Sequence, residues 1–561
     1  MSGAGPGHGA GATVDVLLDE RPVGYVLAHR LRRAGLAAVD AEVLVEAREQ
    51  ARRLTRSRHG AGATSGQLAA QTVDLLGADP ALVRPWTALE DEVARLTTTP
   101  LPVGHEEAPG VDRLRAAVRP TRYERLLQEH APATAGMSAL LAGASRLARL
   151  ELLAAEPGLP PARSDVVCGA AGPLLAGYVL WCLRQAERAG ARRVYFLARD
   201  GEILLRMARH LAAGAGLDLD LRYLEGSRRA WLLQSVAGPG GRDVLAAVLG
   251  RDEKVTVHNC LAWLGVQPRT VSAALAAAGL PEPTWDTHLG PQRLGVLLDV
   301  MVSPEVLALA GGEDADAAAR YLAQSGLQDG TPYALVDADG RGSVGRLLAT
   351  LVRGVGGSLP AVECYLTLNG PVHDAPGRNL RGYLHDEWRG LGTARTTDLW
   401  VAMEVFTAAE HGRVEGYRLV DGAAEAVHGP VVGDLAGWGL GQVRDGLERY
   451  AAVLGPLLPL LGPALDCRVA THAAVLEFWE RPTPAEVRAW GDFPFESDAD
   501  TYLLAEPFTT REVWASVRER RLRFRRRGTW PAGTLHSSPW PVRLVRRAAD
   551  DARSLRRRLR P

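Results

Sequence analysis

The chain of 561 residues carries 65 Lys and Arg against 65 Asp and Glu, and 47% of its residues are hydrophobic. A net charge of zero argues against a general binder of nucleic acids or anionic membranes, and the large apolar share excludes a wholly disordered chain. The length allows roughly three or four domain-sized cores. Because Lys254 is the sole lysine, any bound anion must be held by arginine, by backbone N–H groups or by a metal.

Neither a disulfide framework nor a targeting segment is expected. The five cysteines are widely spaced and form no CxxC pair or Cys/His ligand pattern. Residues 1–12 lack the charged and apolar regions of a signal peptide. The longest apolar runs, Gly169–Leu183 and Ala451–Leu465, are shorter than the roughly 18–20 residues of a spanning helix. We therefore expect a soluble, cytoplasmic protein that binds neither membrane nor nucleic acid.

The first part of the chain, residues 1–160, is predicted to be helical. Apolar residues recur at helical spacing over Tyr25–Arg53, Thr87–Leu96 and Tyr123–Ala155. Proline and glycine in Pro157–Pro161 then mark a boundary.

An α/β pattern begins after this boundary. A mostly apolar helix over Gly172–Arg188 precedes a short strand, Arg193–Leu197. A helix over Glu202–Ala213 and an extended segment, Asp218–Leu224, come next. Helices alternating with short β-branched and aromatic runs are typical of a parallel sheet that is covered on both faces.

The same pattern returns later in the chain. Residues from about 237 to 326 read as a helical insertion, and the strand Tyr333–Val336, the helix Val344–Val352 and the strand Ala361–Leu368 follow it. We therefore predict an α/β core over residues 161–420 that contains this insertion.

Residues 421–561 are predicted to form a mostly helical C-terminal region with a basic tail. Arg511–Pro561 holds sixteen arginines against four acidic residues. Basic tails bind RNA or acidic partners, which gives a non-enzymatic hypothesis for this protein. Alternatively, the tail docks on the acidic remainder of the chain, since Leu522–Arg525, Trp530 and Trp540 are suited to packing.

The strongest local motif follows the strand Tyr333–Val336. Two acidic residues, Asp337 and Asp339, precede a loop composed of Gly340, Arg341, Gly342 and Ser343. Glycines let consecutive N–H groups turn inward, and the next helix adds the positive end of its dipole, so the loop is suited to an anion. The alternative is an ordinary turn in which Asp339 or Ser343 caps the helix.

Two further polar turns follow predicted strands. They comprise Arg199, Asp200 and Gly201 in the first turn, and Ser227, Arg228 and Arg229 in the second. Guanidinium groups suit a pyrophosphate. Taken singly, an Asp-Gly turn is routine, and adjacent arginines are typical of a solvated face. Because all three motifs follow strands of one predicted sheet, we expect them along a single edge.

Together the three motifs resemble the phosphoribosyltransferases that use phosphoribosyl pyrophosphate (PRPP), over roughly residues 165–420. In that family an early loop binds pyrophosphate, and a later strand ends in two acidic residues and a loop for the 5-phosphate. The resemblance implies a phosphoribosyltransferase-like core, Mg²⁺, catalytic and metal-binding roles for Asp337 and Asp339, and substrate binding by the three turns. The chain departs from the common pattern because Ala338 splits the acidic pair and the phosphate loop is shorter.

The stretches FLARDG, SRRA and DADGRGS of this chain are similar to the patterns FLxRDG, SRRA and DxGxRGS/T of a bacterial group that transfers phosphoribose to sugar hydroxyls. Within it, the chain resembles the neamine phosphoribosyltransferases of 2-deoxystreptamine antibiotic biosynthesis. The resemblance implies neamine, or another aminocyclitol or sugar, as acceptor and 5″-phosphoribostamycin as product, from which a separate phosphatase removes the 5-phosphate.

The stretch Trp400–Tyr417 also resembles a segment of that group. It contains Glu404, Glu410 and His411. We expect Glu404 to act as the catalytic base, and Glu410 and His411 to bind a cationic acceptor. The alternative is a surface helix and turn with solvated acids.

A competing prediction is a phosphatase of the haloacid-dehalogenase type. In that case Asp337 attacks phosphorus and Asp339 acts as acid and base. Arg341 occupies the place where such loops have threonine, and no later predicted strand ends in the acidic pair that these enzymes use for magnesium.

Overall fold

The computed structural model describes most of the chain at the level of helices, strands and side chains. The described residues are 27, 31, 41–59, 63–97, 120–134, 137–236, 240–249, 255–310, 315–369, 377–392, 399–431, 433–460, 466–496, 501–512 and 530–545. Most of the predicted basic tail lies outside these residues.

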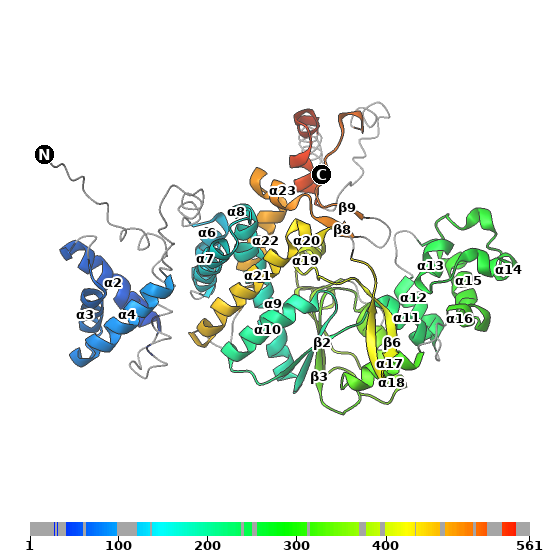
Figure 1. Ribbon diagram of the computed structural model, residues 1–561, viewed down its shortest axis with the longest axis horizontal. Helices are drawn as coiled ribbons and strands as arrows, with labels where there is room; N and C mark the ends of the chain where they lie inside the picture. Colours follow the sequence, from blue (N-terminus) through cyan, green and yellow to red (C-terminus); the bar gives the residue numbers. More distant parts are fainter. Residues whose placement is uncertain are drawn as a thin grey trace, which may run out of the picture. The chain divides into compact units, whose positions relative to one another are not determined.

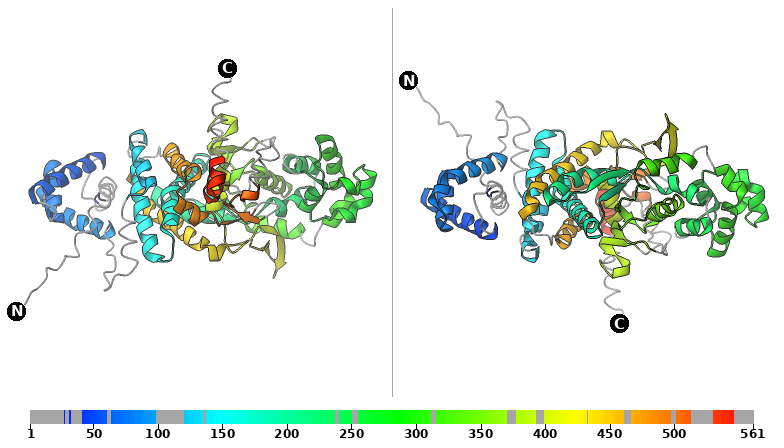
Figure 2. Two further views of the ribbon diagram at one scale, coloured as in Figure 1. Left: turned by 90° about the horizontal axis from the view of Figure 1, so that it is seen from above. Right: turned by 90° about the horizontal axis from the view of Figure 1, so that it is seen from below.

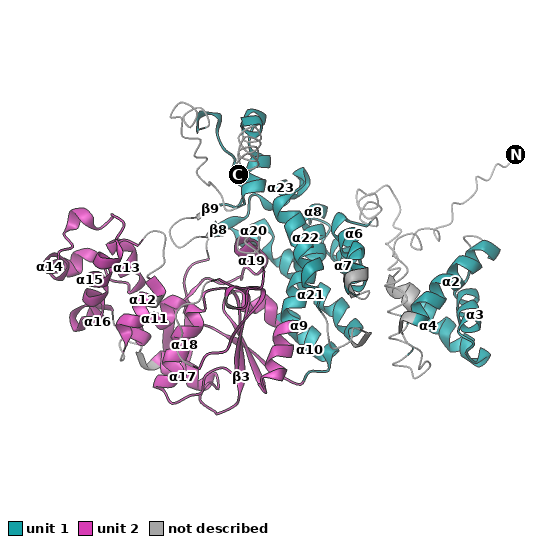
Figure 3. Ribbon diagram, turned by 180° about the vertical axis from the view of Figure 1, so that it is seen from behind, with its two compact units in different colours: residues 1–180, 206–217, 434–561 teal, residues 181–205, 218–433 magenta. Residues whose placement is uncertain are grey.

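The chain divides into two compact units, each assembled from separated segments (Figure 3). Unit 1 comprises residues 1–180, 206–217 and 434–561, and unit 2 comprises residues 181–205 and 218–433. The division into three consecutive regions expected from the sequence, residues 1–160, 161–420 and 421–561, stays a prediction.

Unit 2 is built on a five-stranded parallel sheet (Figure 1). Its strands are β1 (Arg193–Leu197), β2 (Asp220–Leu224), β3 (Tyr333–Gly340), β4 (Val362–Leu368) and β5 (Leu380–Asp386). Their spatial order is β2-β1-β3-β4-β5. β1 and β4 are buried along their whole length, which explains their near-continuous apolar sequences. The predicted mixed α/β class with a parallel sheet is confirmed.

Two features of the sheet differ from the sequence prediction. β3 continues through Gly340, so Asp337 and Asp339 belong to the strand and not to the loop. The reason is that β4 is long enough to pair with this stretch, with Asp339 opposite Thr367. The second difference is β5, which no predicted element represented.

Helices surround the sheet of unit 2. The first after β2 is α11 (Arg228–Val236), which ends before the predicted insertion at about 237–326. The insertion is occupied by α12 (Gly241–Leu249), α13 (Val257–Trp263), α14 (Ser272–Ala277), α15 (Pro291–Met301), α16 (Pro304–Ala310) and α17 (Ala315–Gln324). After β3 comes α18 (Ser343–Gly354), and after β5 comes α19 (Trp400–Phe406). α13 to α16 form a group of their own beside the rest of the unit (Figures 1 and 2). An antiparallel hairpin, β6 (Val414–Val420) and β7 (Ala423–His428), packs against α17.

Unit 1 is mostly helical, as predicted for the two ends of the chain. Its elements are α2 (Ala41–His59), α3 (Ser65–Leu75), α4 (Val83–Thr97), α6 (Arg122–Glu129), α7 (Met137–Ala155), α8 (Pro161–Val166), α20 (Leu435–Trp438), α21 (Leu440–Leu454), α22 (Arg468–Glu480), α23 (Pro484–Trp490), β8 (Pro494–Glu496), β9 (Thr501–Leu503) and α25 (Pro531–Ser537). The helices α9 (Gly172–Arg188) and α10 (Gly201–Ala215) each contribute to both units.

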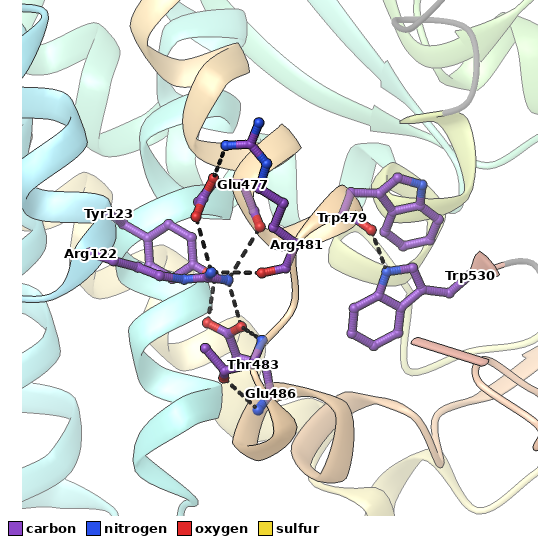
Figure 4. A network of polar contacts seen from close by, with 8 residues as sticks. All are labelled: Arg122, Tyr123, Glu477, Trp479, Arg481, Thr483, Glu486 and Trp530. Carbon is purple, nitrogen blue, oxygen red and sulfur yellow. Dashed lines mark hydrogen bonds and ion pairs between the residues drawn. The ribbon is translucent and has the colours of Figure 1, made fainter. Parts of the chain in front are cut away.

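A polar network ties the start of α6 to α22 and α23 within unit 1 (Figure 4). The guanidinium of Arg122 donates to the carboxylates of Glu477 and Glu486 at 3.2 and 2.6 Å. The hydroxyl of Tyr123 donates to Glu486 at 2.5 Å. The network joins segments more than 350 positions apart in the sequence.

One continuous helical stretch, Pro161–Arg188, is long and apolar enough to cross a membrane. Most of its apolar window is buried in the protein, as in the core helix of a soluble protein. This helix therefore gives only weak support for a membrane span.

Candidate active site

The three polar turns predicted from the sequence follow three neighbouring strands of one sheet. β1 pairs in parallel with β2 on one side and with β3 on the other. The chain moves from β1 to β2 in one direction and from β3 to β4 in the other, so the order reverses between β1 and β3. In open α/β sheets, ligands bind outside the carboxyl ends of the strands at this reversal.

The turn after β1 is held close to its own strand. A Cβ on Gly201 would lie 2.5 Å from the carbonyl carbon of Phe196, so only glycine fits where α10 begins. Arg199 and Asp200 are half-buried in this turn. Burial raises the pKa of the Asp200 carboxyl above its ordinary value, although the hydrogen-bonding contact with Thr407 and the charge of Arg199 act in the opposite direction.

The turn after β2 is occupied largely by structural contacts. The hydroxyl of Ser227 donates to the Val414 carbonyl at 2.6 Å and accepts from the Ala230 N–H at 3.0 Å, which caps α11. The guanidinium of Arg228 lies 5.1 Å from the ring centre of Trp263 in the helical insertion. Arg229 is exposed. The turn thus presents Arg228 beside the insertion, while Ser227 holds the start of β6.

The loop after β3 is shorter than the sequence predicted, because the strand extends to Gly340. Gly342 has a φ of +71° and directly precedes α18. No side chain caps the start of this 12-residue helix. Ser343 is half-buried there, and Arg341 is exposed. The part of the predicted anion loop that remains outside the ladder is therefore Arg341–Ser343 and the first turn of α18.

A buried ion pair between Arg378 and Glu363 holds this loop in place. Arg378 donates to the Gly342 carbonyl at 3.0 Å and to Glu363 at 2.7 and 2.5 Å. The Tyr365 hydroxyl also donates to Glu363, at 2.9 Å. Burial, followed by the charge of Glu363, raises the pKa of Tyr365 well above its ordinary value. The tyrosine consequently stays a neutral donor.

The segment Trp400–Val414, here named the covering segment, contacts all three strands or their turns. α19 packs against β3. The Thr407 hydroxyl oxygen then lies 2.7 Å from Asp200 at the end of β1. His411 lies 2.8 Å from the Tyr223 hydroxyl on β2. The covering segment therefore brings its polar side chains to the edge that carries the predicted site.

His411 belongs to a cluster of polar rings at the end of β2. Its Nδ1 lies 2.9 Å from the Gly412 carbonyl, so this nitrogen carries the hydrogen and Nε2 accepts from Tyr223 in the neutral ring. His411 lies 4.6 Å from the ring of His428, whose Nε2 is 2.8 Å from Glu225. Of the two other predicted residues of the covering segment, Glu404 is half-buried on α19 and Glu410 is exposed.

The expected metal site involves Asp337 and Asp339. Asp337 is half-buried on β3 opposite Tyr365, and the side chain of Asp339 lies outside the described parts of the structure. Among the described side chains, no group of three or more His, Cys, Asp or Glu is arranged to hold a metal ion. Mg²⁺ commonly takes only one or two carboxylates, with substrate phosphates and water as its other ligands, so Asp337 at this edge fits such an ion.

Some residues that shape this edge were missed by the sequence interpretation. Glu363 is an acid inside an apolar run, and this signal could have marked it as one half of a buried pair. Thr407 lies inside the singled-out stretch Trp400–Tyr417 but carries no motif of its own. Tyr223 and His428 meet His411 only through the fold.

Comparison with known proteins does not assign the chain to a family. No protein-family model matches the chain, and no curated protein matches it.

Proposed function

We propose that this protein transfers 5-phosphoribose from PRPP to a hydroxyl group of a sugar or aminocyclitol and releases pyrophosphate. The observation that carries the proposal is the meeting of three turns at one edge of a parallel sheet. These are the turns after β1, β2 and β3, on either side of the reversal in strand order. The turns after β1 and β2 offer guanidinium groups, and the turn after β3 offers the N-terminus of a helix that no side chain caps. Together they suit a sugar that carries a phosphate group at each end.

The two phosphate ends of PRPP are assigned to different strands. Arg199 after β1, together with Asp200 and Gly201, receives the pyrophosphate, and Arg228 assists from the neighbouring turn. Gly340–Ser343 and the first turn of α18 hold the 5-phosphate through backbone N–H groups. Because guanidinium groups favour the negative charge that develops on the leaving pyrophosphate, binding by Arg199 and Arg228 also assists its departure.

Asp337 and Asp339 are assigned to the ribose hydroxyls and to Mg²⁺. When bound, Mg²⁺ would neutralise charge on the pyrophosphate. Asp337 contributes a negative charge near the positively charged sugar of the transition state. Most of the rate enhancement then comes from positioning and charge complementarity.

The covering segment is assigned to the acceptor. Glu404 serves as base, and Glu410 and His411 bind the acceptor, whose ammonium groups would be attracted by carboxylates. An aminocyclitol such as neamine fits this chemistry, and its product, 5″-phosphoribostamycin, would pass to a separate phosphatase. Antibiotic biosynthesis is the role that we propose on the basis of this acceptor.

The phosphatase of the haloacid-dehalogenase type remains the second candidate, and one observation favours it. Asp200 follows β1, the strand that pairs directly with β3. A carboxylate is therefore available beside the strand of Asp337, although it comes earlier in the chain than the sequence prediction required. The two functions differ in product, because a phosphatase releases orthophosphate and a phosphoribosyltransferase releases pyrophosphate.

The test is to incubate the full-length protein with PRPP, Mg²⁺ and a panel of aminocyclitols that includes neamine. We expect pyrophosphate release and an acceptor heavier by one phosphopentosyl group in mass spectrometry. Asp337→Asn should lower kcat/KM about 100-fold or more. Arg418→Met, an exposed change on β6, is the matched control and should leave the rate unchanged. Orthophosphate release without any pentosyl product would contradict the proposal and favour the phosphatase.

A further inference from the structure

The hydroxyl group of Thr407 faces two oxygen atoms with only one hydrogen. Its Oγ lies 2.7 Å from the Met403 carbonyl and 2.7 Å from the Asp200 carboxyl. A threonine hydroxyl can donate once and can accept through its lone pairs. A single hydrogen cannot lie along both short contacts, so one of them needs a hydrogen from the other partner. A backbone carbonyl has none to give, whereas a protonated Asp200 has one.

The surroundings of Asp200 are consistent with a protonated carboxyl group. The group is half-buried, and this burial raises its pKa even though the contact with Thr407 and the charge of Arg199 act in the opposite direction. Arg199 is the charged side chain that acts on it from its own turn, and Thr407 is the polar group that faces it from the covering segment. If the Thr407 hydrogen points to Met403, an ionised Asp200 would place a negative oxygen against hydroxyl lone pairs. Protonation of Asp200 removes that repulsion and satisfies all three oxygens.

We propose that Asp200 is a neutral carboxylic acid that donates its hydrogen to Thr407 at rest and to the leaving pyrophosphate during turnover. The donation to pyrophosphate rests on the proposed function, whereas the protonation of Asp200 at rest does not. Asp200 is adjacent in sequence to Arg199, the residue assigned to the pyrophosphate. In this proposal both residues act on the leaving pyrophosphate. Asp200 gives it a proton, and the guanidinium of Arg199 neutralises its negative charge.

The bond between ribose C1 and the pyrophosphate oxygen breaks, and its electron pair stays on that oxygen. The proton of Asp200 moves to the same oxygen and leaves a carboxylate behind. The acceptor oxygen forms the new bond to C1, and its hydroxyl proton passes to the base and then to water. Asp200 regains a proton from water before the next turnover.

The protonation state is tested without any substrate, by infrared spectroscopy of the full-length protein labelled with ¹³C-aspartate. The carbonyl stretch of a protonated carboxyl group is separate from the stretches of carboxylates, and subtraction of Asp200→Asn assigns it. Asparagine keeps a donor toward Thr407, so this variant should retain the fold, as a thermal melt will show. We expect the Asp200 band to persist to a pH above the ordinary aspartate range. A band that disappears within that range overturns the proposal.

Thr407 variants determine which partner donates. If Asp200 donates, Thr407→Val removes its acceptor and lowers the pH at which the band disappears, whereas Thr407→Ser leaves this midpoint nearly unchanged. If the hydroxyl donates to a carboxylate, Thr407→Val raises the midpoint. A rise in the Thr407→Val variant therefore overturns the proposal.

The catalytic half is tested by the kinetics of phosphoribose transfer. Asp200→Asn should lower kcat about 100-fold with little change in the KM for PRPP, because it retains shape and loses the proton. The wild-type kcat should fall above the pH midpoint of the infrared band. A normal kcat in Asp200→Asn overturns the acid role. Absence of transfer by the wild-type protein contradicts the proposed function alone, since the infrared result still decides the state of Asp200.

Discussion

The guanidinium group of Arg378 forms two hydrogen bonds with the carboxylate of Glu363, and both side chains are completely buried. The same guanidinium reaches the carbonyl of Gly342. This ion pair thus holds the loop that precedes α18. Its two members lie 15 positions apart and belong to β4 and to the segment entering β5.

Loss of one member of this pair should be more harmful than loss of both. Arg378→Met leaves a buried carboxylate without its cation, which should lower the free energy of unfolding by about 3–5 kcal/mol. The double variant Glu363→Leu/Arg378→Met removes both charges and should recover part of that loss. Urea unfolding of the three proteins measures the difference. A double variant less stable than Arg378→Met would contradict this account.

Gly342 should not tolerate a side chain. Its φ is +71°, and an added Cβ would lie 2.7 Å from Leu380. Gly342→Ala should therefore destabilise the protein by about 1–3 kcal/mol. Gly354→Ala at the other end of α18 is the control, because nothing lies within 4 Å of the added Cβ and φ is not left-handed there. It should be neutral or stabilise by up to about 1 kcal/mol in the same urea titrations.

Stability should depend on pH through Asp165 in unit 1. Burial raises the pKa of Asp165 to about 6, against the opposing charge of Arg149. Because the folded protein favours the protonated form, stability is lost as the pH rises from the ordinary aspartate range through about 6. Asp165→Asn should cancel this loss, so its melting temperature should exceed that of wild type at pH 8 and approach it at pH 3.

Asp329 provides a control of opposite sign. The Thr331 backbone N–H and then Arg193 lower the pKa of Asp329 to about 2. Its contribution to stability is present above the unfolded pKa and is lost as the pH falls toward 2. Asp329→Asn should therefore lower the melting temperature at pH 8 and have little effect near pH 2. The same direction of change at pH 8 in both asparagine variants would rule out these pKa assignments.

The network of Figure 4 should be sensitive to one hydroxyl group. Tyr123→Phe removes the donor to Glu486 and an acceptor for Arg122, so the free energy of unfolding should fall by about 1–3 kcal/mol. Arg481→Ala removes an exposed ion pair of the same network and should cost less than about 0.5 kcal/mol. Thermal melts compare the two variants. Equal losses of stability in the two variants would show that the buried hydroxyl of Tyr123 contributes no more than an exposed ion pair.

The α/β class of unit 2 could be predicted because its signals are local. Arg193–Leu197 and the apolar run around Cys364 are short and nearly continuous, which is typical of strands buried on both faces. β5 was missed because Leu380–Asp386 mixes polar and apolar residues and is defined mainly by its pairing with β4. The end of β3 was misplaced for a similar reason, since its pairing with β4 extends the strand to Gly340.

Inspection of the amino-acid sequence was enough to identify the turns that carry arginine, acid and glycine, because residue type and the preceding strand are properties of a short stretch of chain. It could not determine that the turns after β1, β2 and β3 are neighbours, since strand order depends on pairing between distant segments. Nor could it place Thr407 on Asp200, 207 positions away. The two short contacts of the Thr407 hydroxyl exist only after folding, when the Met403 carbonyl and the Asp200 carboxyl both come within hydrogen-bond distance.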